Sequence, residues 1–215
     1  MSFELPKDVL KLEQEEMYTS SELLPTPSRD KIKDNFNPYL YLFHGIRFDH
    51  NLSKLEGIFK EKMILAGQYL SNYFSYSDNA NKGEYVSLLA YDESISYKIF
   101  IQENVSLLIY PECDAILTKY VDYRTWESIK DIKTKNLYSY LDGEYLVKDG
   151  IPFSYVAAIG VPYKYYLHTK GKEKADNILN SIIELMNKYS ISLSIIDTTN
   201  YNRVLYDKEQ TKRRP

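Results

Sequence analysis

The sequence contains few of the residues that build disulfide-linked, zinc-binding or membrane-spanning proteins. Among its 215 residues there is one cysteine, Cys113, which excludes an internal disulfide and a cysteine-rich zinc site. No apolar run approaches the roughly 18 residues that a membrane-spanning helix requires. Residues 1–16 are acidic and amphipathic, and they do not resemble a Sec signal peptide.

Further classes of protein are disfavoured by the charge and by missing motifs. The formal net charge is −3, so no overall basic field attracts nucleic acid, and we interpret the basic run 212–214 as a solvated tail. Neither GxGxxG nor GxxxxGK[ST] occurs, which leaves the common dinucleotide and P-loop sites unsupported. The histidines His44, His50 and His168 lack the spacing of a zinc-binding helix, and we expect no metal cofactor.

The chain divides into a short extension and one main domain. Its apolar fraction of 44% is sufficient for a single domain with a substantial core. Pro6 to Leu24 is predicted to form a helix with proline in its first turn, and the Pro-rich residues 25–28 end it. We therefore predict an N-terminal helical extension over residues 1–37 and one domain over residues 38–215.

The main domain is predicted to belong to the α+β class. Apolar spacing predicts helices at Lys54–Lys62 and Lys172–Tyr189, with a further helical pattern over Asp122–Lys135 and a loop over Gly67–Lys82. A doubly wound α/β sheet would need a helix after nearly every strand, and the sequence does not show that alternation. The predicted strands are Tyr39–Phe43, Tyr85–Ala90, Ile99–Ile101, Val105–Tyr110, Glu144–Val147, Tyr155–Val161 and Ile191–Ile196.

A histidine–glycine pair, His44 and Gly45, stands at the predicted end of the first strand, in the run 41–47 (YLFHGIR). Glycine at such a place lets a ligand lie against bare backbone. Ser87 follows in a later strand, and Glu144 opens another. Asp142 lies two residues before Glu144; in a strand the two share a face, whereas Asp-Gly is also typical of a tight turn, and the local pattern leaves both possibilities open.

The order of these motifs resembles that of the ADP-ribosyltransferase superfamily, in its diphtheria-toxin and poly(ADP-ribose)-polymerase branch. In that branch a first strand ends in His-Gly, a middle strand carries tyrosine or serine, and a late strand begins with the catalytic glutamate. His44-Gly45, the middle strand 84–88 (EYVSL) and Glu144 match these elements in order, and residues 151–156 (IPFSYV) are similar to the return strand of several bacterial members. The resemblance covers residues 39–162 and implies a split β-sheet core.

The resemblance implies a site for NAD⁺, which serves as a substrate. Glu144 would orient the ribose 2′-hydroxyl and stabilise the developing cation. His44 would bind a ribose hydroxyl, and the backbone of Gly45 would pair with the nicotinamide carboxamide. Arg47 would reach the pyrophosphate.

Two further roles follow from the middle strand. Ser87 would support the glutamate or the ribose through a hydrogen bond. Tyr85 is one of several tyrosines that could stack on the nicotinamide ring, together with Tyr73 and Tyr76.

The implied activity is mono-ADP-ribosyl transfer, a pentosyltransferase reaction, to a macromolecule, with a protein as the favoured acceptor over nucleic acid. The setting would be a bacterial or phage effector or toxin, acting in the cytoplasm or delivered to a host cytoplasm without a Sec signal. Two alternatives stay open. One is a non-catalytic interaction protein on the same fold, and the other is an NAD-dependent enzyme resembling RNA 2′-phosphotransferases.

Overall fold

The described residues of the computed structural model form a mixed α+β architecture, as the sequence predicts. They are residues 19–30, 32–33, 36–47, 52–66, 85–91, 95–113, 115–117, 144–200 and 203–207. The predictions for residues 67–82 and 122–135, the basic run 212–214, and His50 lie outside them, as does most of the predicted first helix.

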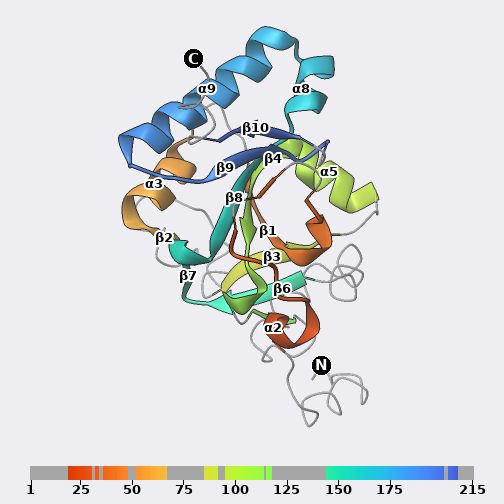
Figure 1. Ribbon diagram of the computed structural model, residues 1–215, viewed down its shortest axis with the longest axis vertical. Helices are drawn as coiled ribbons and strands as arrows, with labels where there is room; N and C mark the ends of the chain where they lie inside the picture. The colour runs from red at the N-terminus through yellow and green to blue at the C-terminus, as the bar shows by residue number, and fades with distance from the viewer. Residues whose placement is uncertain are drawn as a thin grey trace, which may run out of the picture.

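An eight-stranded sheet in the order β10-β9-β8-β4-β1-β3-β6-β5 organises the described residues (Figure 1). All neighbouring strands are antiparallel except β8 and β9, which run parallel. A separate pair joins β2 (Met63–Leu65) to β7 (Gly150–Pro152). The strands of the main sheet are β1 (Leu42–Arg47), β3 (Tyr85–Ala90), β4 (Asn104–Ile109), β5 (Ile116–Leu117), β6 (Glu144–Lys148), β8 (Val156–Val161), β9 (Ser194–Asp197) and β10 (Val204–Tyr206).

Helices cover both faces of this sheet. The α-helices are α2 (Ser20–Leu23), α3 (Ser53–Glu61), α5 (Ile95–Glu103), α8 (Tyr163–Thr169) and α9 (Lys172–Lys188), and short 3-10 turns are η1 (Pro38–Leu40), η3 (Pro111–Cys113) and η5 (Phe153–Tyr155). Alternate residues of β1 enter different core clusters, because neighbours on a strand point to opposite faces. The main core contains Leu42 with residues of α3 and α9, and the second contains Phe43 with residues of α5.

The C-terminal unit β8-α8-α9-β9 follows directly from the apolar pattern. Helix α9 buries Ile182 and Met186 in the main core, and the remaining residues of its predicted stripe pack around them. The helix returns the chain to β9, which pairs in parallel with β8, as a crossover connection permits. Helix α8 and strand β10 were not predicted, because both are short and neither has a clear period.

Two sequence predictions are wrong. The predicted strand Ile99–Ile101 lies inside helix α5, where Ile101 is buried and Ile99 is 49% exposed. A short apolar run cannot distinguish a strand from one turn of a half-buried helix. The first strand begins at Leu42 and not at Tyr39, because residues 38–40 form the 3-10 turn η1. His44 and Gly45 therefore lie in the middle of β1 and not at its end.

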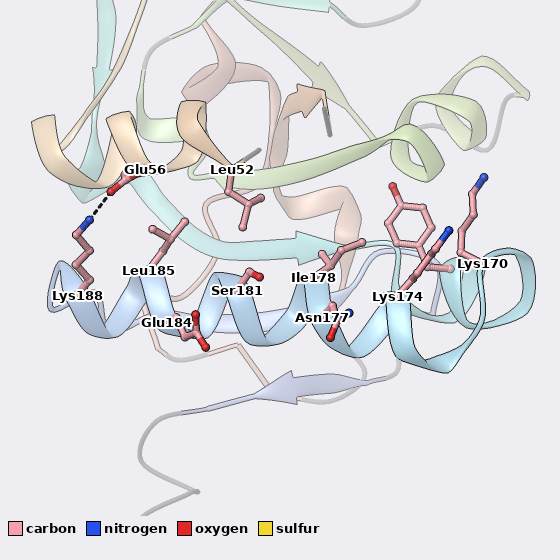
Figure 2. A pocket seen from close by; sticks show the side chains of 11 residues that line it. Leu52, Glu56, Lys170, Lys174, Asn177, Ile178, Ser181, Glu184, Leu185 and Lys188 are labelled. Carbon is pink, nitrogen blue, oxygen red and sulfur yellow. Dashed lines mark hydrogen bonds and ion pairs between the residues drawn. The ribbon is translucent and has the colours of Figure 1, made fainter. Parts of the chain in front are cut away.

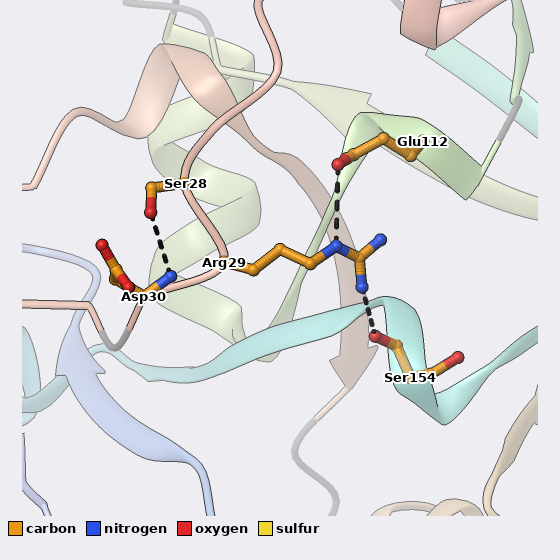
Figure 3. A network of polar contacts seen from close by, with 5 residues as sticks. All are labelled: Ser28, Arg29, Asp30, Glu112 and Ser154. Carbon is orange, nitrogen blue, oxygen red and sulfur yellow. Dashed lines mark hydrogen bonds and ion pairs between the residues drawn. The ribbon is translucent and has the colours of Figure 1, made fainter.

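The described part of the N-terminal extension is anchored on the main domain. The Arg29 guanidinium lies over the rings of Tyr110 and Tyr155, at 4.7 and 5.7 Å from their centres. Its Nε lies 3.7 Å from the Glu112 carboxylate, and the guanidinium donates a hydrogen bond to the Ser154 carbonyl oxygen at 3.4 Å (Figure 3). These contacts fix residues 28–30 against η3 and η5.

Within the described residues, no helix is both long enough and apolar enough to cross a bilayer.

Candidate functional site

The strands that carry the three sequence motifs are neighbours in the sheet. The order β1-β3-β6 places the strand of His44 and Gly45 beside the strand of Ser87, and that strand beside the strand that Glu144 begins. In the β3–β6 register, Glu144 pairs with Leu89, and Ser87 pairs with Leu146. Segments separated by more than 40 residues in the sequence are thus brought together by β pairing.

The pairing between β1 and β3 is short. Their pairing consists of Leu42 with Ala90 and Phe43 with Leu89, and no further pair joins the two strands within the described residues. From His44 onward β1 stays paired with β4, whereas the first half of β3 stays paired with β6. The sheet therefore consists of two parts, one containing β1 and β4 and the other containing β3 and β6, which are joined by a short pairing.

The side chain of His44 makes a contact across the part of β1 and β3 where the two strands are not paired. Its Nδ1 lies 3.0 Å from the carbonyl oxygen of Ser87. Burial lowers the pKa of His44, the Ser87 carbonyl opposes that shift, and the positive charge of Lys54 in α3 lowers the pKa further. The ring is therefore neutral at pH 7, and because a carbonyl oxygen only accepts, the proton belongs on Nδ1. Nε2 then carries a lone pair that can accept a hydrogen bond from a hydroxyl group.

Gly45 is packed closely against helix α5. A side chain at this position would overlap the ring of Phe100 and would lie 3.2 Å from Cγ of Asn104. The bare face of Gly45 is therefore covered by protein, and a ligand could use its backbone N–H or C=O but not this face. No signal in the sequence indicates this contact, because α5 itself was predicted as a strand.

Ser87 contributes to the site through its backbone. Val86 and Leu88 on either side of it are buried in the main core, whereas Ser87 is exposed, so its side chain lies on the other face of β3. His44 shares the face of Leu42 and Ile46, which are also in the main core. The contact between the two predicted site residues is therefore made by a carbonyl oxygen, which a sequence motif cannot reveal.

The remaining predicted site residues are placed by their backbone alone. Arg47 ends β1, Tyr85 begins β3 and Glu144 begins β6, but their side chains lie outside the described part of the structure. Tyr145, which follows Glu144, is buried in the main core. That His44 and Glu144 line one cleft stays a prediction.

A groove of about 840 Å³ lies elsewhere, along helix α9, and it was not predicted from the sequence (Figure 2). None of the predicted site residues lines it. Its walls come from α3, α8 and α9, and its lining residues are Leu52, Glu56, Tyr166, Lys170, Lys174, Asn177, Ile178, Ser181, Glu184, Leu185 and Lys188. The sequence feature that could have indicated this groove is the side of α9 where polar residues such as Lys174, Ser181 and Lys188 are interspersed with Ile178 and Leu185.

Comparison of the chain with family models, curated proteins and solved structures gives no match. Among the described residues, no three His, Cys, Asp or Glu side chains gather as a metal site would require.

Proposed function

We propose that the chain is an NAD-dependent mono-ADP-ribosyltransferase that modifies a protein acceptor. The support is the resemblance in motif order together with the adjacency of the three strands that carry those motifs. A split sheet core is part of this proposal, and the short β1–β3 pairing is consistent with it. NAD⁺ would lie beside the part of β1 and β3 where the two strands are not paired.

The observation that carries the proposal is the state of His44. Its Nδ1 is held by the Ser87 carbonyl oxygen, its pKa is lowered, and its Nε2 is left as an acceptor. A neutral imidazole oriented in this way can accept a hydrogen bond from a ribose hydroxyl and fix the sugar relative to the bond that breaks.

In the proposed reaction the bond between nicotinamide and the ribose breaks, and nicotinamide leaves with the bonding electron pair. Glu144 would hold the 2′-hydroxyl and stabilise the positive charge on the ribose. The acceptor side chain then forms the new bond at the same carbon and loses its proton, which Glu144 can help to remove. Gly45 would take part through its backbone groups only, because Phe100 covers its open face.

The alternative is a non-catalytic interaction protein with the same architecture. The packing of Phe100 against Gly45 favours it, because that contact gives a structural reason for the glycine without any ligand. The two functions differ in what happens to NAD⁺, and this difference can be measured directly.

The test is release of nicotinamide from NAD⁺, followed by transfer of label from NAD⁺ to proteins of a lysate. Glu144→Gln keeps the size of the side chain and should lower both rates by about 100- to 1,000-fold, as loss of one transition-state contact does. His44→Gln should weaken NAD⁺ binding as well as slow the reaction. Equal rates in the wild type and both variants would contradict the proposal, and no turnover in any of them would favour the interaction protein.

A further inference from the structure

The groove along α9 has an apolar middle and charged ends, and these properties restrict the kind of molecule that can occupy it. Leu52, which directly precedes α3, faces Ile178, Ser181 and Leu185 of α9 across the middle of the groove (Figure 2). These residues give an apolar floor, and Ser181 is the small residue at its centre. A groove between two helices with such a floor suits the apolar face of a third helix.

The two ends of the groove carry different charges. At one end the Lys188 ammonium lies 2.6 Å from the Glu56 carboxylate, and the Tyr189 hydroxyl donates a second hydrogen bond to the same oxygen at 2.8 Å. The charges at this end are therefore already compensated. At the other end Lys170 and Lys174 are exposed, and among the described residues neither lies in an ion pair.

This charge distribution departs from that of the whole chain, which has a net charge of −3. Two uncompensated lysines at one end attract an acidic group there, while Glu184 and the Glu56–Lys188 pair disfavour a uniformly negative polymer such as nucleic acid. The matching partner is apolar along its length and acidic at one end.

The length of the groove also agrees with a helix. Lys174 and Lys188 are 14 positions apart on α9, so at 1.5 Å per residue the groove runs for roughly 21 Å along the helix axis. A partner helix of about four turns spans that distance and places three or four apolar side chains over Ile178, Ser181 and Leu185.

We propose that the α3–α9 groove binds an amphipathic helix of a partner protein, with the acidic end of that helix against Lys170 and Lys174. Helix α3 links the groove to the candidate site, since it supplies Glu56 to the groove and the charge of its Lys54 acts on His44. If the proposed function holds, the partner is the acceptor protein; the binding itself does not depend on that function.

The test uses two synthetic helical peptides of about 14 residues with the same leucine stripe. The first carries glutamates in its terminal turn, and the second carries lysines in the same places. Fluorescence anisotropy should show that the wild type prefers the acidic peptide by about tenfold or more. The double variant Lys170→Glu/Lys174→Glu should reverse that preference. Equal affinity of the wild type for both peptides would overturn the proposal.

A second pair of variants tests the floor of the groove. Ser181 is exposed, so Ser181→Trp should leave the fold intact while filling the groove and lowering the affinity for the acidic peptide by about tenfold or more. Asn180→Trp is the matched control, because Asn180 is exposed on the same helix and does not line the groove. Equal binding by both tryptophan variants would place the peptide elsewhere and contradict the inference. Because nicotinamide release is not measured here, failure of this proposal is distinct from failure of the proposed reaction.

Discussion

Asp197 at the end of β9 and His44 in β1 are both polar side chains set into the sheet, but their hydrogen bonds are distributed differently. The Asp197 carboxylate accepts from the backbone N–H of Lys164 through Oδ2, and from the N–H and hydroxyl of Thr199 through Oδ1. His44 has one such contact, at Nδ1, and its other ring nitrogen points to no protein partner in the hydrogen bonds of the described residues.

The comparison separates a structural polar group from a candidate functional one. Asp197 is 1% exposed, and both of its carboxylate oxygens hold the first turn of α8 and the turn after β9 in place, so its hydrogen bonds serve the fold. His44 is fixed at one nitrogen, and its lowered pKa keeps the other nitrogen unprotonated and able to accept a hydrogen bond. A partly buried polar residue with remaining hydrogen-bonding capacity, such as His44, is the better guide to a binding site.

The largest effect on stability should come from Asp197→Ala. Its removal leaves the donors of Lys164 and Thr199 without their acceptor, and hydrogen bonds to a charged group contribute about 1.5–3 kcal/mol each. We expect the free energy of unfolding to fall by about 3 kcal/mol in urea denaturation, with Thr199→Ala losing about 1 kcal/mol as a partial control. A loss below 1 kcal/mol for Asp197→Ala would show that this carboxylate is not structural.

Gly45→Ala should have the next largest effect. The added methyl group meets the ring of Phe100, and overpacking of this kind destabilises a core by about 1–3 kcal/mol. The double variant Gly45→Ala/Phe100→Leu should regain most of that loss, since the smaller side chain relieves the contact. If stability returns while NAD⁺ binding does not, Gly45 serves the ligand as well as the packing; if both return, packing alone explains the glycine.

The pH dependence of stability tests the environment of His44. Because its pKa is lower in the folded chain than the ordinary value near 6.5, the unfolded chain binds a proton first as the pH falls. The contribution of neutral His44 to the free energy of unfolding is complete above about pH 6.5. It decreases as the pH falls from there towards the pKa that His44 has in the folded chain. The slope should be no steeper than about 1.4 kcal/mol per pH unit.

The control for that measurement is His44→Gln, which should flatten the slope just below about pH 6.5. Glu56 and Asp176, whose pKa values are lowered by hydrogen bonds to Lys188 and to Lys172, contribute stability that is lost only as the pH falls below about 4.5. Loss of the His44 contribution therefore begins at a higher pH than loss of the carboxylate contributions. An unchanged slope in His44→Gln would indicate that the histidine titrates normally.

The smallest effect is expected from Ser87→Ala. The contact with His44 uses the carbonyl oxygen of Ser87, which alanine retains, and the side chain is exposed. The His44 pKa, followed by NMR, should stay the same, and the free energy of unfolding should change by less than about 0.5 kcal/mol. A fall in nicotinamide release without a change in that pKa would restore a direct role for the hydroxyl group.

Elements with a clear period were predictable from the sequence, and long-range contacts were not. Strand β3 and helix α9 have nearly the predicted bounds, because alternation and a helical stripe are local properties. Helix α5 was missed because its run of apolar residues is short and half-buried. The parallel pairing of β8 with β9 depends on a crossover that no local pattern specifies.

The candidate site shows the same limit. The sequence singles out His44, Gly45 and Ser87, but it does not reveal how they are connected. The His44 contact is made to a carbonyl oxygen, which every residue type has, and the Phe100 contact with Gly45 depends on where α5 packs. The residue types therefore indicate where a candidate site lies. Strand pairing and helix packing determine which atoms of each residue are available there.

The short pairing between β1 and β3 also bears on how the molecule opens. Since these strands are joined only at Leu42–Ala90 and Phe43–Leu89 within the described residues, few hydrogen bonds must break to separate the half of the sheet that contains β3 and β6. In native-state amide hydrogen exchange the two halves would then behave as separate cooperative units. The short β1–β3 pairing, beside which the proposed function places NAD⁺, is therefore also where we expect subglobal unfolding to separate the sheet.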